Sequence, residues 1–453
     1  MQRIHFIAIG GSAMHNLAIT LHKKGYDITG SDDEIFEPSR SRLNKYGLLP
    51  AKEGWHVDKI HNHLDGVIVG MHAKPGNPEL KAATEKNLPV FSFPEYLYEH
   101  SRNKKRIVIG GSHGKTTTTA MILHVLYHLG IKTDYMVGAQ LDGFETMVSL
   151  SSDAESMILE GDEYLTSPLD PRPKFHVYRP HTAVITGIAW DHMNVFPTFE
   201  NYLEQFRIFI RNIKAGGRLF YCSEDPHLKN LMNNASDDID TRGYSLPEYS
   251  NREGVTHIHH GTTSYPMKIF GRHNLLNMEA ARLVCESQGV SSPDFYNAMK
   301  SFNGASNRLE KVKETNDFVL FKDFAHAPSK VKATLNAVRE RYPDRKLIAL
   351  FELHTYSSLS KNFLPNYKET MDEADMALAY YNPHTLSLKR LPDLSKNEIK
   401  KSFGRKDLQV YTDISDMKQF LTTQDYHNSA VLVMSSGNFG GVDWNKIFLT
   451  ESH

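Results

Sequence analysis

The stretch IVIGGSHGKTTTT, residues 107–119, places an apolar run, two glycines and a Gly-Lys-Thr sequence ahead of a segment with helical spacing. Glycines let backbone N–H groups converge on phosphate oxygens, and the N-terminus of the following helix adds partial positive charge. A lysine there can neutralise the β- and γ-phosphates, and the next hydroxyl can bind Mg²⁺. An ordinary strand–turn–helix with a surface lysine is the alternative. The pattern favours a loop that binds a nucleotide's phosphates with Mg²⁺, formed by Gly111, Ser112, His113, Gly114, Lys115, Thr116 and Thr117.

An acidic cluster follows the next apolar stretch, SMILEGDE at residues 156–163. Its carboxylates belong to Glu160, Asp162 and Glu163, where a parallel strand of a nucleotide-binding sheet would end. A carboxylate there is placed to bind the Mg²⁺ that accompanies the phosphates. Alone, such a cluster is typical of a solvated turn. Beside a phosphate loop, it predicts that Glu160 shares a metal ion with Thr116.

Histidine and asparagine side chains supply further candidates. We interpret TAVITGIAWDH, residues 182–192, as a buried strand that ends in Asp191 and His192. An imidazole can bind a metal ion or stabilise a phosphoryl group, so His192 is a predicted metal ligand. In GRHNLLN, Asn274 and Asn277 lie on one helix face. Their carboxamides could bind adenine or a phosphate oxygen, or they could simply begin an amphipathic helix.

The N-terminal AIGGSA resembles a pyrophosphate-binding turn, although Ala8 and Ala13 replace the outer glycines of that pattern. It predicts a Rossmann-like domain. A nicotinamide-dependent oxidoreductase would share this turn but would leave the Gly-Lys-Thr loop unexplained. By contrast, HIHH at residues 257–260 is interpreted as an exposed loop or edge strand and not as a metal site.

The order of apolar and helical stretches predicts three consecutive α/β domains. They are a Rossmann-like domain (residues 1–104), a central phosphate-loop ATPase-like domain (105–304) and a Rossmann-like C-terminal domain (305–453). Arg308, Asp323 and His326 begin the third domain, from which an arginine could reach the γ-phosphate after domain closure.

The net charge is −1 and there are two cysteines, without a long basic block or an apolar run long enough for a membrane span. The composition therefore indicates a cytoplasmic protein without a nucleic-acid partner.

Together and in this order, these motifs resemble those of the Mur ligases, the ATP-dependent amide-forming enzymes of peptidoglycan metabolism. GGSHGKTTTTAM is similar to the family's phosphate loop. The resemblance implies catalytic roles for Lys115, Glu160, His192 and Arg308, ATP binding by Asn274, Asn277, Arg308 and Asp323, and metal binding by Thr116, Glu160 and His192. It also implies substrate binding by Gly10, Gly11, Ser12, Ala13, His72, Arg172, Lys174 and His326.

IHFIAIGGSAM is similar to the members that take UDP-N-acetylmuramate itself, of which one adds a recovered tripeptide and another adds L-alanine. DEYLTSPLDPRPKF and VMSSGNFGG resemble the tripeptide-adding type, whereas ELHTYSS, residues 352–358, is nearer the alanine-adding type, and Ala327 stands where both usually carry a second histidine. The resemblance implies ligation of L-alanyl-γ-D-glutamyl-meso-diaminopimelate through an acyl phosphate. L-Alanine ligation is the alternative within the family, and a phosphate-loop kinase or regulatory NTPase is the alternative from another class.

Overall fold

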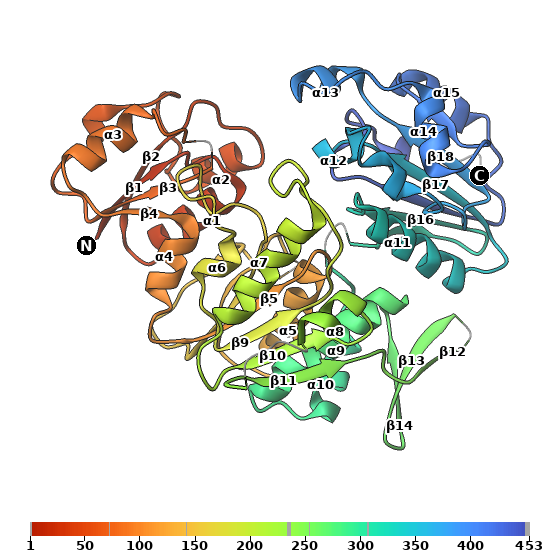
Figure 1. The fold of residues 1–453 in the computed structure, drawn as a ribbon, viewed down its shortest axis with the longest axis horizontal. Coiled ribbons are helices and arrows are strands. Elements are labelled where there is room, and N and C mark those ends of the chain that lie inside the picture. The colour runs from red at the N-terminus through yellow and green to blue at the C-terminus, as the bar shows by residue number, and fades with distance from the viewer. Residues whose placement is uncertain are drawn as a thin grey trace. The chain divides into compact units, whose positions relative to one another are not determined.

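The first sheet of the chain is parallel and has the strand order β2-β1-β3-β4 (Figure 1). The computed structural model describes residues 2–71, 73–141, 143–232, 237–252, 254–305 and 308–448. Ile7, Val67, Val69 and Leu80 form part of one apolar cluster, so this sheet is covered by α3. The elements are β1 (Arg3–Ile7), α1 (Ser12–Lys23), β2 (Asp27–Ser31), α2 (Ser39–Lys45), β3 (Gly66–Val69), α3 (Pro78–Glu85), β4 (Val90–Ser92) and α4 (Phe93–His100).

The second sheet has seven strands in the order β11-β10-β9-β5-β8-β6-β7 and is parallel except for the pairing of β6 with β7. Its central strands read as continuous apolar runs because both faces are covered. The elements are β5 (Lys105–Gly110), α5 (Lys115–His128), β6 (Asp134–Met136), β7 (Val148–Ser149), β8 (Ser156–Glu160), α6 (Lys174–Val177), β9 (Thr182–Ile185), α7 (Phe199–Arg211), β10 (Arg218–Cys222), α8 (Pro226–Met232) and β11 (Asp240–Tyr244).

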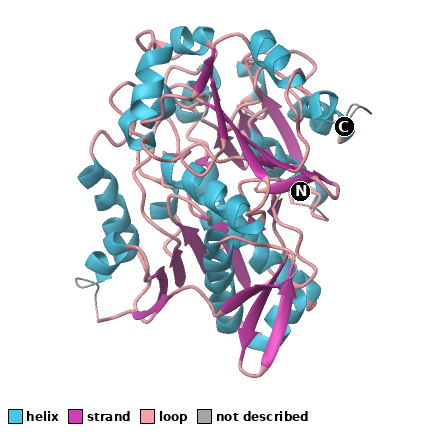
Figure 2. Ribbon diagram, turned by 90° about the vertical axis from the view of Figure 1, so that its right-hand side faces the viewer, coloured by secondary structure: helices cyan, strands magenta, loops and turns pink. Residues whose placement is uncertain are grey.

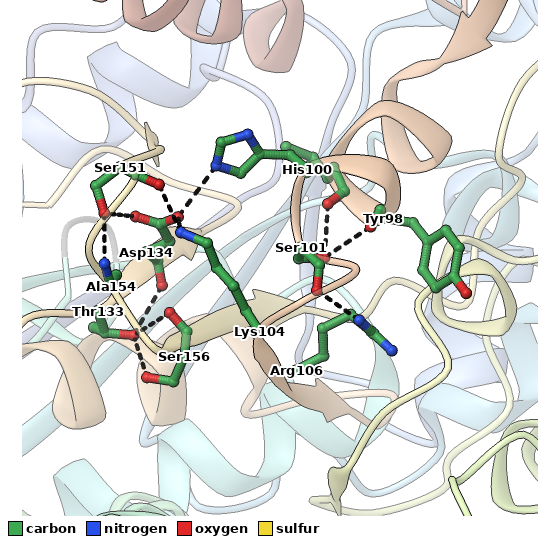
Figure 3. A network of polar contacts seen from close by, with 11 residues as sticks. Tyr98, His100, Ser101, Lys104, Arg106, Thr133, Asp134, Ser151, Ala154 and Ser156 are labelled. Atoms are coloured by element: carbon green, nitrogen blue, oxygen red, sulfur yellow. Dashed lines mark hydrogen bonds and ion pairs between the residues drawn. The ribbon is translucent and has the colours of Figure 1, made fainter.

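The connection between these two sheets is a packed polar joint rather than a loose linker. Figure 3 shows His100 and Lys104 converging on Asp134, at the start of β6. Lys104 Nζ lies 2.5 Å and His100 Nε2 lies 3.3 Å from Asp134 Oδ2, while the Ser151 hydroxyl donates to Asp134 Oδ1 at 2.7 Å. The guanidinium of Arg106 is buried and donates to the backbone oxygens of Ser101 and Tyr178. The joint fixes the C-terminal end of α4 against the start of β6.

The remaining strands form two sheets, one antiparallel with the order β12-β13-β14 and one with the order β15-β16-β20-β17-β18-β19. In the latter, only β15 pairs antiparallel. The elements are β12 (Tyr249–Arg252), β13 (Val255–His260), β14 (Thr263–Met267), α9 (Arg272–Ser287), α10 (Ser292–Met299), β15 (Glu310–Glu314), β16 (Phe318–Asp323), α11 (Pro328–Arg341), β17 (Lys346–Glu352), α12 (Tyr356–Leu359), β18 (Met376–Tyr380), α13 (Pro383–Leu388), α14 (Lys396–Phe403), β19 (Gln409–Tyr411), α15 (Ile414–Thr422), β20 (Ser429–Met434) and α16 (Trp444–Phe448).

The six-stranded sheet separates two apolar clusters. Val319 and Phe321 point into one with α11 and α14, whereas Phe318 and Leu320 point into the other with α15 and α16. This alternation is the two-residue period of a strand whose faces are both covered by helices. Figure 2 shows the helices and strands of the fold, and helices connect most of the parallel strands along the chain. The predicted fold class, three consecutive α/β domains, is confirmed.

Contacts divide the chain into two units, residues 1–188 with 203–245 and 280–298, and residues 189–202 with 246–279 and 299–453. The proposed boundaries after residues 104 and 304 therefore stay predictions.

Two element predictions are wrong. The strand expected to reach Asp191 and His192 ends at Ile185, because Gly187 has a φ of +154° and the chain leaves the sheet there. HIHH lies in β13, which is the central strand of its sheet because it is paired on both sides.

Candidate active site

The predicted phosphate loop connects β5 to α5, as the sequence indicates. Gly111 and Gly114 have φ values of +129° and +81°, a region that favours glycine. A Cβ on Gly111 would lie 2.2 Å from Thr186 Oγ1, so the loop passes directly against the chain that follows β9. Ser112 N also donates to Gly187 O at 2.9 Å. Both the backbone angles and the close packing therefore require glycine at position 111.

Lys115 opens α5 and is held by a buried carboxylate. Its Nζ lies 2.7 Å from Glu163 Oε2 and donates to Gly111 O at 2.6 Å. Burial alone would lower the pKa of Lys115, but the charges of Glu163 and Asp162 outweigh burial and raise this pKa above its ordinary value. Lys115 is therefore a fixed cation at the N-terminus of a helix, as phosphate binding requires.

Thr116 and Glu160 meet beside this lysine. Thr116 Oγ1 donates to Glu160 Oε1 at 2.8 Å, and Gly138 N donates to Glu160 Oε2 at 2.7 Å. Burial, followed by the charge of Asp162, raises the pKa of Glu160. A hydroxyl and a carboxylate in contact are oxygen donors suited to Mg²⁺, which keeps several waters and uses few protein ligands. Within the described ranges there is no cluster of three or more His, Cys, Asp or Glu that could hold a metal ion. The pair fits Mg²⁺ only together with water and phosphate oxygens.

The N-terminal turn has the backbone conformation that its glycine-rich pattern predicts. Ala8 has a φ of +68°, so an alanine occupies a conformation that glycine adopts more easily. Gly10 N donates to Asp32 Oδ2 at 2.8 Å, and Asp32 is fully buried just after β2. Asp32 is not among the residues predicted from the sequence, although an acidic residue about 20 positions after such a turn is a signal for this position.

A pocket of about 160 Å³ lies over this turn, between the N-terminus of α1, the carboxyl ends of β1 and β3, and the segment before α6. Its lining includes Gly11, Ser12, Ala13 and Lys174 from the predicted substrate-binding set. Lys174 Nζ lies 2.8 Å from Asp162 Oδ2, and Asp162 raises the pKa of Lys174 despite burial. The pocket is therefore linked through an ion pair to the acidic stretch beside Lys115.

Arg172 lies two positions before Lys174, and its side chain forms an ion pair with a carboxylate of its own loop. Its guanidinium donates to both carboxylate oxygens of Asp170, with the shortest contact at 2.6 Å, and it lies 3.9 Å from Glu95 Oε1. The side chain is 57% exposed. His72 lies outside the described residues.

A second polar cluster lies within the other unit. His326 Nε2 is 3.7 Å and Lys330 Nζ is 4.0 Å from Asp191 Oδ2, which are electrostatic contacts beyond hydrogen-bond distance. Asp191 Oδ1 accepts from His192 N at 2.7 Å, and His192 has a φ of +54°. Burial alone would raise the pKa of Asp191, but His326, His192 and Lys330 hold it well below its usual range. Lys330 is not among the residues predicted from the sequence, because it carries no local signal beyond its place on α11.

Asn274, Asn277, Arg308 and Asp323 also belong to this unit. Both asparagines are buried on α9, and Asn274 Nδ2 donates to Phe270 O at 3.0 Å. The Arg308 guanidinium lies 4.4 Å from the centre of the Phe324 ring. Asp323 accepts from Ala325 N and Thr334 Oγ1 at 3.0 and 2.8 Å, and burial raises the pKa of its carboxyl group.

Models of three domains of one protein family match successive parts of the chain. Residues 3–105 match the Mur ligase family, catalytic domain; residues 109–285 match the Mur ligase middle domain; and residues 307–437 match the Mur ligase, glutamate ligase domain. UDP-N-acetylmuramate--L-alanyl-gamma-D-glutamyl-meso-2,6-diaminoheptandioate ligase of Haemophilus influenzae is 30% identical over 454 residues, 98% of each chain. The chain belongs to the Mur ligase family.

This Mur ligase is also similar to a second curated protein and to a solved structure. UDP-N-acetylmuramate--L-alanine ligase of Lactiplantibacillus plantarum is 29% identical over 445 residues, 96% of this chain and 95% of that protein. The crystal structure of a murein peptide ligase from Psychrobacter arcticus has a TM-score of 0.69 at 24% identity over 98% of both chains, and it shows the same fold.

As a Mur ligase, the protein is an ATP-dependent enzyme that forms amide bonds. No helix in the part of the chain that the structure describes is long and apolar enough to cross a bilayer.

The geometry brings Lys115, Thr116 and Glu160 together in one unit, and it brings His192 near His326 through Asp191 in the other. The individual roles assigned to the site residues stay predictions.

Proposed function

We propose that this Mur ligase joins UDP-N-acetylmuramate to L-alanyl-γ-D-glutamyl-meso-diaminopimelate at the expense of ATP. The observation that carries the proposal is the link from the pocket over the glycine turn, through Lys174 and Asp162, to the acidic stretch that holds Lys115. A nucleotide-sugar pocket and a phosphate loop within one unit suit a reaction in which the acceptor is phosphorylated before the amine attacks. Both ATP and nucleotide sugars are cytoplasmic metabolites, so we place the reaction in the cytoplasm.

In the first step, an oxygen of the lactoyl carboxylate bonds to the γ-phosphorus and the bond from that phosphorus to ADP breaks. In the second step, the amino nitrogen bonds to the acyl carbon, the carbon–oxygen bond to phosphate breaks, and the nitrogen loses a proton. Lys115, at the start of α5, would offset charge on the transferring phosphoryl group. Thr116 and Glu160 would hold Mg²⁺, which supplies further charge neutralisation when bound. Positioning and electrostatics therefore account for most of the protein's contribution.

The choice of amine rests on the segment between the acidic motif and α6. Its backbone forms a short hairpin, with Leu165 paired to Pro173 and Thr166 N donating to Arg172 O at 2.8 Å. The proline-rich segment resembles that of the tripeptide-adding type, and the Haemophilus influenzae relative is named for that tripeptide. L-Alanine is the second candidate, because ELHTYSS resembles the alanine-adding type.

One experiment tests both the class of reaction and the amine. The protein is incubated with ATP, Mg²⁺ and UDP-N-acetylmuramate, with tripeptide or L-alanine offered separately, and the products are identified by mass. We expect the tripeptide adduct, with ADP formed only when both acceptor and amine are present. ADP formation without an amine-containing product would favour a kinase or NTPase, and preferential use of L-alanine would assign the enzyme to the alanine-adding type.

A further inference from the structure

The pocket over the glycine turn contains a polar group whose hydrogen-bonding capacity is unused. Thr166 is 3% exposed and lines the pocket, yet its Oγ1 has no hydrogen-bond partner within the part of the chain that the structure describes. Its backbone is fixed, because Thr166 N donates to Arg172 O across the hairpin. A buried hydroxyl without a partner is unfavourable, so a bound group that pairs with Thr166 Oγ1 would be favoured in this pocket.

Lys174 brings a positive charge to the lining, which also contains the Ser12 hydroxyl, a donor to Met147 Sδ at 3.7 Å. Lys174 is 23% exposed and contacts Asp162 through one of its three donors, so hydrogen-bonding capacity remains for a bound molecule. The other walls are mainly apolar or backbone, including Met14, Val69 and Phe93. A cation and a hydroxyl donor in a mainly apolar pocket suit one anionic oxygen group.

The volume limits how much of a substrate the pocket can hold. At about 160 Å³ it is smaller than the roughly 300–1,000 Å³ of an ordinary ligand pocket, so it takes only part of a nucleotide sugar. Two anionic parts of UDP-N-acetylmuramate could bind here, the diphosphate and the lactoyl carboxylate. Ser12, the first residue of α1, lies at the N-terminus of this helix, whose dipole suits the diphosphate.

The position of Lys174 favours the carboxylate for the other end of the pocket. Lys174 contacts Asp162, which lies between Glu160 and Glu163, the partners of Thr116 and Lys115. The carboxylate must meet the γ-phosphate, so it belongs at the end of the pocket that leads toward Lys115. We infer that Thr166 Oγ1 and Lys174 Nζ bind the lactoyl carboxylate of the acceptor and thereby select muramyl over unsubstituted sugar nucleotides. This inference rests on the proposed function and assigns Lys174 to the acceptor rather than to the amine.

The test compares the dissociation constants of UDP-N-acetylmuramate and UDP-N-acetylglucosamine, which lacks the lactoyl group. Binding is measured calorimetrically without ATP or amine. Thr166→Val and Lys174→Met each remove one proposed contact, Thr166→Ser keeps the hydroxyl, and Lys132→Met removes a lysine from another Lys–Asp pair, with Asp153. A melting curve is recorded for every variant.

We expect the full chain to prefer UDP-N-acetylmuramate, and we expect Lys174→Met to reduce that preference about ten- to a hundredfold, the range for a hydrogen bond to a charged group. Thr166→Val should reduce it by a smaller factor, while Thr166→Ser and Lys132→Met keep it. An unchanged preference in Lys174→Met, or an equal loss of affinity for both nucleotides, would overturn the carboxylate assignment. If the unaltered protein binds neither nucleotide, the proposed function itself is wrong.

Discussion

Lys115 Nζ lies 2.7 Å from Glu163 Oε2, so a buried carboxylate holds the lysine of the phosphate loop. Both side chains are largely buried, at 11% and 3% exposure. A bound phosphate would therefore replace or share an existing ion pair instead of meeting an unpaired cation. The pair thus makes Lys115 important for stability as well as for turnover, and the two effects can be separated.

Lys115→Ala should lower kcat about a thousandfold or more, because the charge on the transferring phosphoryl group loses its neutralising partner. The same variant should lower the melting temperature, because Glu163 is left buried without its cation. Lys115→Ala with Glu163→Gln should regain much of the stability and none of the turnover. Steady-state kinetics and melting curves check both effects, with the exposed Lys81→Ala as control. Turnover within a few-fold of the unaltered enzyme would refute the phosphate-loop assignment.

Glu160→Gln should raise the Mg²⁺ concentration required for half-maximal activity about tenfold or more, because the amide keeps the shape of the side chain but loses the charge that binds the metal. The hydrogen bond from Thr116 Oγ1 can persist, so the loop should stay folded. Titration of activity with Mg²⁺ measures the shift, and Glu155→Gln is the control at an exposed glutamate. A midpoint that does not move would show that Glu160 is not a ligand.

Asp134→Asn should destabilise the protein by about 3 kcal/mol near neutral pH, because Lys104 loses its buried carboxylate partner. Burial alone would raise the pKa of Asp134, but His100, Lys104 and Ser151 lower it overall. A folded-state pKa below the unfolded one contributes stability that is present above pH ~4 and is lost as the pH falls through the folded pKa.

The melting temperatures of the Asp134→Asn variant and the unaltered protein should therefore converge below pH ~4. Asp153→Asn, in a solvent-exposed pair with Lys132, is the control and should change stability little at any pH. A pH-independent difference would mean that Asp134 contributes through packing alone.

Arg308→Ala should lower kcat strongly while the dissociation constant for UDP-N-acetylmuramate stays unchanged, if its predicted role is with ATP. The matched control is Arg341→Ala, since Arg341 also lies over a phenylalanine ring, 5.5 Å from the centre of Phe270. Equal kinetic effects of both substitutions would indicate that Arg308 acts through packing on Phe324.

The sequence alone determined the elements whose signals are local. Apolar runs, helical periodicity and glycines at turns are set by neighbours a few positions away, so β5, the phosphate loop and α5 follow from residues 107–128. The same reasoning placed Glu160 at the end of β8 and both asparagines on α9. It overextended the strand before Asp191, because apolar residues continue after the backbone has left the sheet at Gly187.

Only the tertiary structure decided which side chains meet. Glu163 pairs with Lys115, Thr116 bonds to Glu160, and Asp191 faces His326, across sequence separations that no local pattern encodes. Strand order also made β13 central, although its histidines suggest an exposed edge. Thr166 resembles any other loop threonine in the sequence; its burial beside Lys174 is a consequence of hairpin pairing. Such contacts arise when distant segments pack together, because burial and charge pairing depend on the whole fold and not on neighbouring residues.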